Sequence, residues 1–428
     1  MKNIFKVFPN FISDIIIKAK GPYLYLKKSG KILDTTAGAT SFAILGWSNP
    51  KIIKSINRQL KKFTHIDYKV FHDDNLEKLS NVLLKNNKTK LSKVYFSGNS
   101  GAESCEAALR MSYQIRTLQK KPEKKWFISR KQSYHGATAD ALALGDRPTI
   151  NFYQKTLSRF RAKIDMHHPL YKKKKNESEE EYALRSANLL EKKILQIGPE
   201  KVSGFVAETI MGGLVGDVPP AKNYWKHIRK ICDKYDVHLI IDECYCGTGT
   251  TGEYFCINWD NISPDFLFIG KTLAAGYGAL GAVLTTEKIY KPIKKYGRLL
   301  HSTTYQGHSL SAAAALEVQS HINNKNFLES VKNKGTYMMK ILNRELNYLE
   351  NFIEVRGRGM RFSVEHKAKS NDKFARFITE QMMKRKIFVS SKFHRTCFTP
   401  SLLLNYKEID RILDNFINVF KKANKRNY

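Results

Sequence analysis

Long apolar runs are missing from this sequence, and cysteine is scarce. No uninterrupted hydrophobic segment approaches the roughly 18 residues that cross a bilayer, so we expect no integral membrane protein. Asn10 and Asp14 interrupt the apolar N-terminal stretch, and no small-residue cleavage site follows, so a secretory signal is not expected. The six cysteines are too few and too irregularly spaced for a disulfide framework, and a cytoplasmic location is therefore expected. Cys244 and Cys246 have no second Cys/His pair at zinc spacing, so no metal site is expected either.

Acidic residues are also scarce. The chain has 73 Lys and Arg against 39 Asp and Glu, a formal net charge of +34. Such an excess is typical of proteins that bind polyanions, so a basic nucleic-acid-binding protein without catalysis is an alternative hypothesis. The basic residues are spread along the whole chain, with local runs only at 172–175 and 421–428, and no aromatic-interleaved motif accompanies them. We therefore expect no dedicated nucleic-acid function.

Alternating helix and strand patterns fill most of the chain. At 428 residues it exceeds one compact core and predicts two or three domains. Unbroken apolar runs between helical patterns indicate strands buried on both faces of a mostly parallel sheet in an α/β domain. We expect a large domain over 61–320 and a smaller α+β domain built from an N-terminal segment, 1–60, and a C-terminal segment, 321–428. The expected elements are a hairpin over 20–36; helices over 51–63, 76–86, 101–119, 178–198, 223–236, 308–322, 326–350, 372–386 and from 407; strands over 94–98, 125–130, 202–208, 237–243 and 265–271; and extended segments over 351–366 and 387–391.

Lys271 is the candidate catalytic residue. It follows the apolar run DFLFIG and opens a glycine-rich stretch, and Asp242 ends another apolar run 29 residues earlier. A pyridoxal phosphate enzyme needs these two groups, because the lysine forms a Schiff base with the cofactor aldehyde and the carboxylate keeps the pyridine nitrogen protonated. The alternative interpretation is a lysine that only carries a strand end into water.

Four further motifs lie at strand ends or in loops. SGNSGAE, residues 97–103, lies between a strand and a helix, where backbone N–H groups and the helix dipole favour an anion such as phosphate. The others are SYHG with Tyr134 and His135, AETIMGG with Glu208, and STTYQG with Thr303 and Thr304. Because ligands bind at the carboxyl ends of strands in an open α/β sheet, we expect these segments to converge on one site.

The order and spacing of NSGAE, SYHG, AET, DE followed by GTGTTG, GK followed by GYG, and HSTTYQG resemble the class III aminotransferases of the fold type I pyridoxal phosphate enzymes, from about residue 20 to 415. The resemblance implies pyridoxal 5'-phosphate as cofactor, with Lys271 as its attachment point and proton carrier and Asp242 as the partner of the pyridine nitrogen. It also implies cofactor contacts from Ser100, Gly101 and Ala102 to the phosphate, from Tyr134 and Cys244 to the two ring faces, from Glu208 to the hydrogen-bond network of the ring, and from Thr304 to the phosphate bound by the partner subunit. The last contact implies a homodimer with a shared active site. For His135, a site role and a structural role both stay open.

Departures from the family pattern fall on the parts that select the substrate. Tyr245 stands where many relatives have glutamine, and Thr209 replaces the usual proline after Glu208. Cys397 occupies the position where many members carry the arginine that binds a substrate carboxylate. Arg395 would take over that role only if the backbone shifted, and we expect it to be an exposed arginine of the small domain.

The missing arginine bears on the choice of substrates. Without it, the sequence favours a terminal amine, a diamine or an ω-amino acid as donor over an α-amino acid. The family implies a keto acid or an aldehyde as acceptor, in a ping-pong exchange that uses Lys271 in both halves. An aminomutase, or another pyridoxal phosphate reaction on the same fold, is the alternative, because aminomutase relatives also lack this arginine.

Overall fold

The structure is a computed structural model that describes residues 3–5, 7, 8, 10, 13–85, 87–148, 150–153, 156–426 and 428. The expected N-terminal segment, 1–60, and the C-terminal segment, 321–428, lie partly outside these residues. In the described part the chain forms three sheets, and none of its helices is long and apolar enough to cross a membrane.

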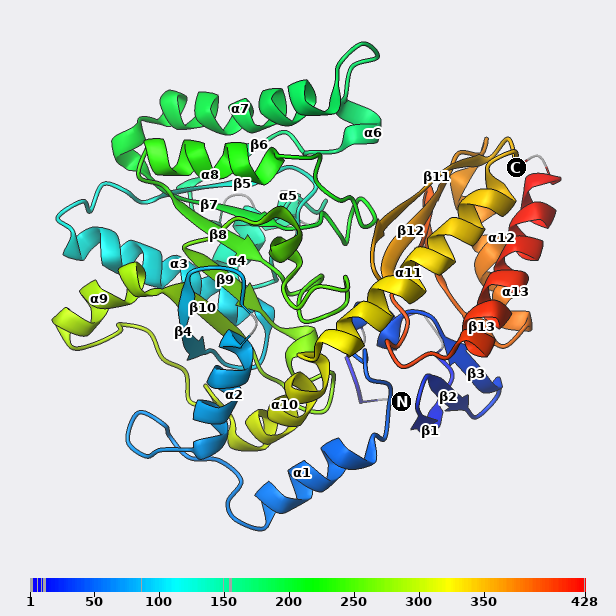
Figure 1. The fold of residues 1–428 in the computed structure, drawn as a ribbon, viewed down its shortest axis with the longest axis horizontal. Coiled ribbons are helices and arrows are strands. Elements are labelled where there is room, and N and C mark those ends of the chain that lie inside the picture. The colour runs from blue at the N-terminus through cyan, green and yellow to red at the C-terminus, as the bar shows by residue number, and fades with distance from the viewer. Residues whose placement is uncertain are drawn as a thin grey trace.

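The largest sheet lies at the centre of the α/β part of the molecule (Figure 1). Its strands, in spatial order, are β4 (Leu91–Phe96), β10 (Ala282–Thr286), β9 (Phe266–Ile269), β8 (His238–Asp242), β7 (Val202–Glu208), β5 (Trp126–Arg130) and β6 (Arg161–Ile164). β10 is antiparallel to both neighbours, and the other strands run parallel to one another. The parallel strands therefore end at one edge, where open α/β sheets bind ligands. The sequence pattern does not predict β6 or β10.

Side chains of the central strands are buried on both faces. In β8, Leu239 and Ile241 belong to one buried cluster, and Ile240 belongs to another on the opposite face. The first face packs against α7 (Glu179–Ile197) and α8 (Tyr224–Lys234), and the second against α3 (Gly101–Leu118), α4 (Ala139–Leu144) and α9 (Glu287–Tyr296). The expected capping box of α7 is confirmed, because Ser178 and Glu181 bond to each other's backbone N–H. The unbroken apolar runs are explained by this two-sided cover.

Two smaller sheets bring the ends of the chain together. The first has the order β1 (Ile16–Lys20), β2 (Tyr23–Leu26), β3 (Gly30–Asp34) and β13 (Ile387–Phe388), and the second has the order β11 (Phe352–Arg358), β12 (Arg361–His366), β15 (Arg395–Phe398) and β14 (Ser390–Lys392). β13 pairs in parallel with β3, so the N-terminal strands lie beside the C-terminal elements (Figure 1). The domain boundaries near 60 and 320 stay a prediction.

The remaining helices connect or cover these sheets. They are α1 (Pro50–Leu60), α2 (Asp74–Leu84), α5 (Ile150–Tyr153), α6 (Pro169–Lys172), α10 (Ser309–Ile322), α11 (Lys325–Leu346), α12 (Asn371–Lys384) and α13 (Tyr406–Asn424). α11 and α12 both pack against α13, and α11 covers β11. α12 also contacts β14, so these helices cover the C-terminal sheet.

Two extended segments differ from the sequence prediction. The stretch over 351–366 is the hairpin of β11 and β12, which turns at Gly359 with a φ of 58°. The stretch over 387–391 is divided between β13 and β14, which belong to different sheets. β15, which the sequence pattern does not predict, brings Arg395 and Cys397 into the C-terminal sheet.

Candidate active site

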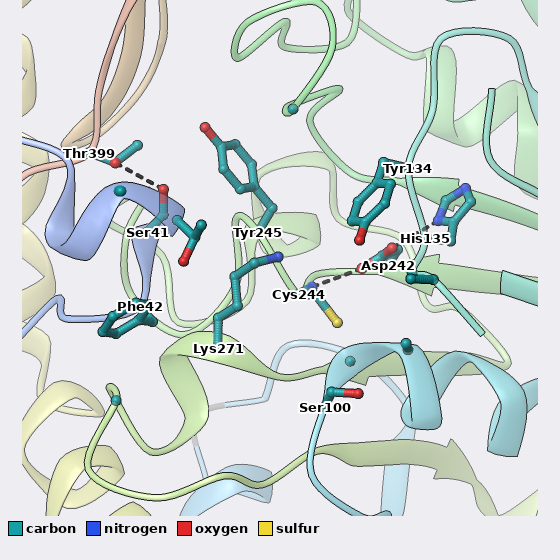
Figure 2. Close-up of a pocket in the computed structure, with 18 of the residues that line it drawn as sticks. Ser41, Phe42, Ser100, Tyr134, His135, Asp242, Cys244, Tyr245, Lys271 and Thr399 are labelled. Carbon is teal, nitrogen blue, oxygen red and sulfur yellow. Dashed lines mark hydrogen bonds and ion pairs between the residues drawn. The ribbon is translucent and has the colours of Figure 1, made fainter. Parts of the chain in front are cut away.

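A cavity of about 910 Å³ lies at the strand ends of the central sheet. Three parts of the chain line it: the strand ends, loops and helix start around the central sheet, the N-terminal segment over 36–42, and the stretch over 390–399 that contains β14 and β15. The hydroxyl groups of Ser41 and Thr399 lie 2.9 Å apart and tie the last two parts together across 358 positions (Figure 2). The cavity therefore forms only when both ends of the chain fold against the central sheet.

Asp242 lies at the base of the cavity, at the end of β8. It is 4% exposed, and its carboxylate accepts hydrogen bonds from His135 Nδ1 (2.8 Å) and from the Cys244 N–H (2.9 Å), as Figure 2 shows. Two donors thus fix the orientation of a buried carboxylate, which would otherwise be costly to bury. The structure therefore places His135 in the site, in contact with Asp242.

Glu208 ends the neighbouring strand β7, directly opposite Asp242 in the ladder. The Gly212 N–H lies 3.5 Å from its Oε1, and Oε2 has no partner among the described residues. Burial raises the pKa of Glu208 to about 7, although electrostatic interactions with His135 and Arg130 oppose that rise. A carboxyl group that titrates near neutrality beside a paired carboxylate is typical of functional sites.

Lys271 follows β9 after Gly270, in a turn where its φ is +24°. A positive φ is strained for a residue with a side chain, so the surrounding structure must hold this turn in place. The side chain lies between Tyr245 and Cys244 in the view of Figure 2, with Nζ 5.8 Å from the centroid of the Tyr245 ring. No described carboxylate lies within 4.0 Å of Nζ, so the amine has no ion-pair partner in this part of the chain.

The first turn of α3 lies close to the ends of β8 and β9. A Cβ atom added to Gly101 would lie 2.3 Å from Cys244 Sγ, and one added to Gly270 would lie 2.8 Å from the Gly101 nitrogen. Only glycine permits this approach at either position. Ser100 caps the helix, and its hydroxyl accepts from the Glu103 N–H (3.5 Å). The N–H groups of Gly101 and Ala102 are left at a helix start that favours an anion.

Tyr134 and Tyr245 line the cavity, and an arginine is stacked on each of them. The guanidinium carbon of Arg147 lies 3.7 Å from the centroid of the Tyr134 ring. That of Arg361 lies 3.6 Å from the centroid of the Tyr245 ring. Both contacts are of cation–π type and hold the two phenol rings in place.

Arg395 lines the cavity, so the expectation of an exposed arginine is wrong. It is 5% exposed, and its Nη2 donates a hydrogen bond to the Gly213 carbonyl (3.3 Å). The pairing of β15 with β12 aligns it with Glu365 and directs its side chain to the loop that follows β7. Cys397 also lines the cavity, with Sγ 3.2 Å from the Ser363 hydroxyl. Arg395 thus reaches the cavity while its backbone stays in regular pairing with β12, without a shift of the backbone.

Thr304 does not line the cavity of its own chain. It is exposed, and its carbonyl accepts a hydrogen bond from His65 Nε2 (3.0 Å). Thr303 lies in the same turn, where its N–H donates to Gln306 Oε1 (3.2 Å). The remaining predicted site residues all line one cavity: Ser100, Gly101, Ala102, Tyr134, Glu208, Asp242, Cys244 and Lys271.

Several lining residues had no signal in the sequence. Ser41 and Phe42 come from a segment of small residues, and their place in the cavity depends on contacts with distant parts of the chain. Arg147 follows α4 in the stretch GDRP, which resembles an ordinary turn.

Thr209, noted as a departure from the family pattern, is buried and donates to Glu243 Oε1 (2.9 Å). It therefore supports the neighbouring strand end.

The polar atoms at the base of the cavity fit pyridoxal phosphate. His135 Nε2 and Glu208 Oε2 are buried and have no hydrogen-bond partner among the described residues. Buried polar atoms without partners indicate that a polar ligand completes the site. A lysine amine, a carboxylate oriented by two donors, and an anion-binding helix start are the groups that this cofactor requires. Within the described residues, no group of three or more His, Cys, Asp or Glu is placed to hold a metal ion.

Comparison with known proteins agrees with this geometry. The model of the class III aminotransferases matches residues 9–420. The chain is 31% identical to gamma aminobutyrate transaminase 2 of Solanum lycopersicum, over 96% of this chain and 92% of that protein. It is 30% identical to vanillin aminotransferase of Capsicum chinense, again over 96% and 92%. The solved omega transaminase of Pseudomonas jessenii in complex with PMP superimposes with a TM-score of 0.91 at 27% identity, over 99% of this chain and 97% of that one.

Proposed function

The chain belongs to the class III aminotransferases, which use pyridoxal phosphate, and from this premise we propose that Lys271 holds the cofactor and moves the proton during amino transfer. The observation that supports this most directly is the convergence of Lys271, Asp242 and the first turn of α3 in one cavity. The aminomutase and nucleic-acid-binding alternatives are not favoured, because the matched proteins are transaminases.

Each predicted cofactor-binding residue of one chain has a role in the proposal. The phosphate would be held by Ser100 and the N–H groups of Gly101 and Ala102, the pyridine nitrogen by Asp242, the two ring faces by Tyr134 and Cys244, and the polar edge of the ring by Glu208. When bound, pyridoxal phosphate supplies the electron sink for the negative charge that develops at the substrate Cα. His135 holds Asp242 in position through its Nδ1 hydrogen bond.

Lys271 has the geometry of a proton carrier. Its Nζ is free of ion pairs with the described carboxylates and extends into the cavity from a strained turn. In the proposed reaction Nζ takes the proton that leaves the substrate Cα and holds it within the cavity. The same amine serves both halves of a ping-pong exchange.

We assign a terminal amine or an ω-amino acid as donor and a keto acid or aldehyde as acceptor. Cys397 at the family's arginine position supports this choice, because a neutral thiol cannot bind an α-carboxylate in a bidentate pair. The matched proteins named for gamma-aminobutyrate and vanillin, an ω-amino acid and an aldehyde, also support it.

Thr304 is proposed to complete the active site of a partner subunit. In one chain Thr304 is exposed, and exposed apolar side chains lie in its loop and in the loop over 63–71 that contacts it through His65, among them Phe63, Phe71 and Tyr305. Apolar patches of this kind mark protein–protein contacts. A homodimer with shared sites would cover them.

Mixing two inactive variants tests the shared site. Thr304→Arg should block the phosphate position in the partner, and Lys271→Ala should remove the amine. Hybrids of the two carry one intact site, so an equimolar mixture refolded together should regain about one quarter of wild-type activity. No regain, or activity in Thr304→Arg alone, would contradict the shared site.

A cytoplasmic location is also proposed. All six cysteines are free thiols, and five of them are buried, which suits a reducing compartment. Fractionation of cells that express the chain would test this, and recovery in an oxidising compartment would contradict it.

Substitution of Lys271 tests the function itself. We expect Lys271→Ala to lower transamination by at least about 10³-fold while the protein stays folded, because the amine that holds the cofactor and carries the proton is gone. Lys288→Ala, at an exposed position of α9, is the matched control and should keep full activity.

Chemical trapping tests the assignment of Lys271 by a second method. Borohydride reduction of the cofactor-loaded wild type should attach the cofactor to the peptide that contains Lys271. Attachment at another lysine, or wild-type turnover in Lys271→Ala, would refute the assignment.

A further inference from the structure

Arg147 is a cavity-lining arginine without an acidic partner. It follows α4, is half-buried, and has its guanidinium stacked on Tyr134. Its Nε is buried and has no hydrogen-bond partner, and no described carboxylate lies within 4.0 Å of the guanidinium. A buried charged donor without an acceptor is costly, so an acceptor from a ligand is expected there.

A second arginine reaches the same part of the cavity. Arg395 Nη2 donates to the Gly213 carbonyl (3.3 Å), and a Cβ atom built on Gly213 would lie 3.8 Å from Arg147 Nη2. Both guanidinium groups therefore approach Gly213. The acidic residue opposite Arg395 in the sheet, Glu365, forms its ion pair with Arg356 instead.

The charges of the cavity leave a positive excess. Its charged lining residues are Arg147, Lys271, Lys392, Arg395, Glu208 and Asp242. Lys271 is assigned to the cofactor, and Asp242 is bonded to His135. Arg147, Arg395 and Lys392 therefore face the substrate space with no described acid bonded to them in an ion pair. Such a space attracts an anion and repels a second ammonium group.

We propose that Arg147, with Arg395 beside it, binds the anionic group of the amino donor. The preferred donors are then ω-amino acids with a carboxylate or sulfonate, ahead of alkylamines and diamines. The planar guanidinium fork suits such a group, because it donates two parallel hydrogen bonds. This inference rests on the proposed function, and it assigns anion recognition to Arg147 and Arg395 instead of the position of Cys397.

Paired donors test the proposal. Each ω-amino acid from 3-aminopropanoate to 6-aminohexanoate is compared with the alkylamine of equal carbon number, and kcat/KM is measured with one fixed keto acid. The wild type should prefer the acids. Arg147→Met should lower kcat/KM for the best acid about 100-fold and for its paired amine less than about threefold, because only the acid loses a charge-assisted pair.

Two further variants serve as controls. Arg147→Lys should recover part of the preference, because it restores the charge without the fork. Arg185→Met is the matched control, since Arg185 stacks on Tyr182 and pairs with Glu177 away from the cavity, and it should leave both donors unchanged. An equal loss for acids and amines in Arg147→Met, or a wild-type preference for amines, would overturn the proposal.

Calorimetric titration with pentanoate measures the anion site without chemistry. The cofactor-loaded wild type should bind pentanoate at least about tenfold more tightly than Arg147→Met does, and Arg185→Met should match the wild type. Equal binding by wild type and Arg147→Met would overturn the anion site. Failure of every donor to transfer its amino group would instead refute the proposed function, and the titration would still decide whether Arg147 binds anions.

Discussion

Two tyrosine–arginine stacks border one cavity, and they differ in what surrounds the guanidinium. The distances from guanidinium carbon to ring centroid are nearly equal, 3.6 Å for Arg361 on Tyr245 and 3.7 Å for Arg147 on Tyr134. Arg361 is fully buried, and its Nη1 lies 3.8 Å from Asp217 Oδ1. Arg147 is half-buried and has no described carboxylate within 4.0 Å. Stacking geometry alone therefore does not distinguish the two.

The electrostatic partner distinguishes them. The negative charge of Asp217 compensates the positive charge of Arg361 within the protein. The Ser363 hydroxyl in turn holds Asp217, because it donates a hydrogen bond to Asp217 Oδ2 (2.7 Å). That stack fixes Tyr245 at the position where many family members carry glutamine. The Arg147 stack holds Tyr134 in the same way, but the charge of Arg147 stays available to a ligand. One contact type thus serves structure in one place and recognition in the other.

Breaking the ion pair between Asp217 and Arg361 should have the largest effect on stability. Asp217→Asn keeps the side-chain shape and tolerates the φ of +51° at this position, but it leaves Arg361 without a compensating charge. We expect the free energy of unfolding to fall by about 3 kcal/mol, because a buried charge has lost its partner. Urea unfolding at fixed protein concentration measures this. The double variant Asp217→Asn/Arg361→Met should be more stable than the sum of the single changes, and strict additivity would contradict the pairing.

Two buried carboxyl groups at the strand ends extend the comparison. Asp242 is bonded to His135, whereas Glu208 Oε2 has no described partner and the pKa of Glu208 is raised to about 7. Between pH 4.5 and 7 the unfolded chain loses this proton while the folded chain keeps it. Stability should therefore fall as pH rises through that window, by about 3 kcal/mol, and level off above it.

Glu208→Gln isolates this contribution. The difference in unfolding free energy between wild type and Glu208→Gln should change across the window, with the wild type losing stability relative to the variant as pH rises. Urea unfolding at pH 5 and pH 7.5, without added cofactor, gives both values. A difference that stays constant between these pH values would show that Glu208 titrates normally.

The Tyr134 ring should matter more than its hydroxyl. Tyr134→Leu removes the surface on which Arg147 and the cofactor ring are expected to stack, and should weaken cofactor binding by about 1 kcal/mol. Tyr134→Phe keeps the ring and should change the affinity little. Equilibrium titration of the two variants with pyridoxal phosphate separates these cases. An equal loss in both would assign the effect to the hydroxyl.

Arg147→Met should have the smallest effect on stability. Its guanidinium has no acid to leave unpaired, so the unfolding free energy should change by less than about 1 kcal/mol, the cost of one partly exposed cation–π contact. Urea unfolding beside Asp217→Asn provides the direct contrast. A loss as large as that of Asp217→Asn would place Arg147 among the structural residues and remove the distinction between the two stacks.

Local patterns in the sequence were sufficient for the base of the site. Lys271, Asp242 and Glu208 each end an apolar run, and parallel strands carry such ends to a common edge whatever the rest of the chain does. The helix start at Ser100 was readable for the same reason, because a cap and a glycine turn act over a few residues. The fold class followed from the alternation of helices and two-sided strands. The contact of Thr304 with a partner subunit stays a prediction.

Only the tertiary structure determines which residues form the wall of the cavity. The expectation for Arg395 was wrong because its burial depends on the pairing of β15 with β12 and on the loop at Gly213, which lies 182 positions away. In the sequence, Arg147 resembles an arginine of an ordinary turn. Only the structure shows that it stacks on Tyr134 and has no described carboxylate within 4.0 Å. Hydrophobic period and turn chemistry depend on neighbours along the chain, which is why the sequence by itself determined where the strands end and which side chains stand there. Whether a charge is compensated depends on neighbours in space, and only folding brings those together.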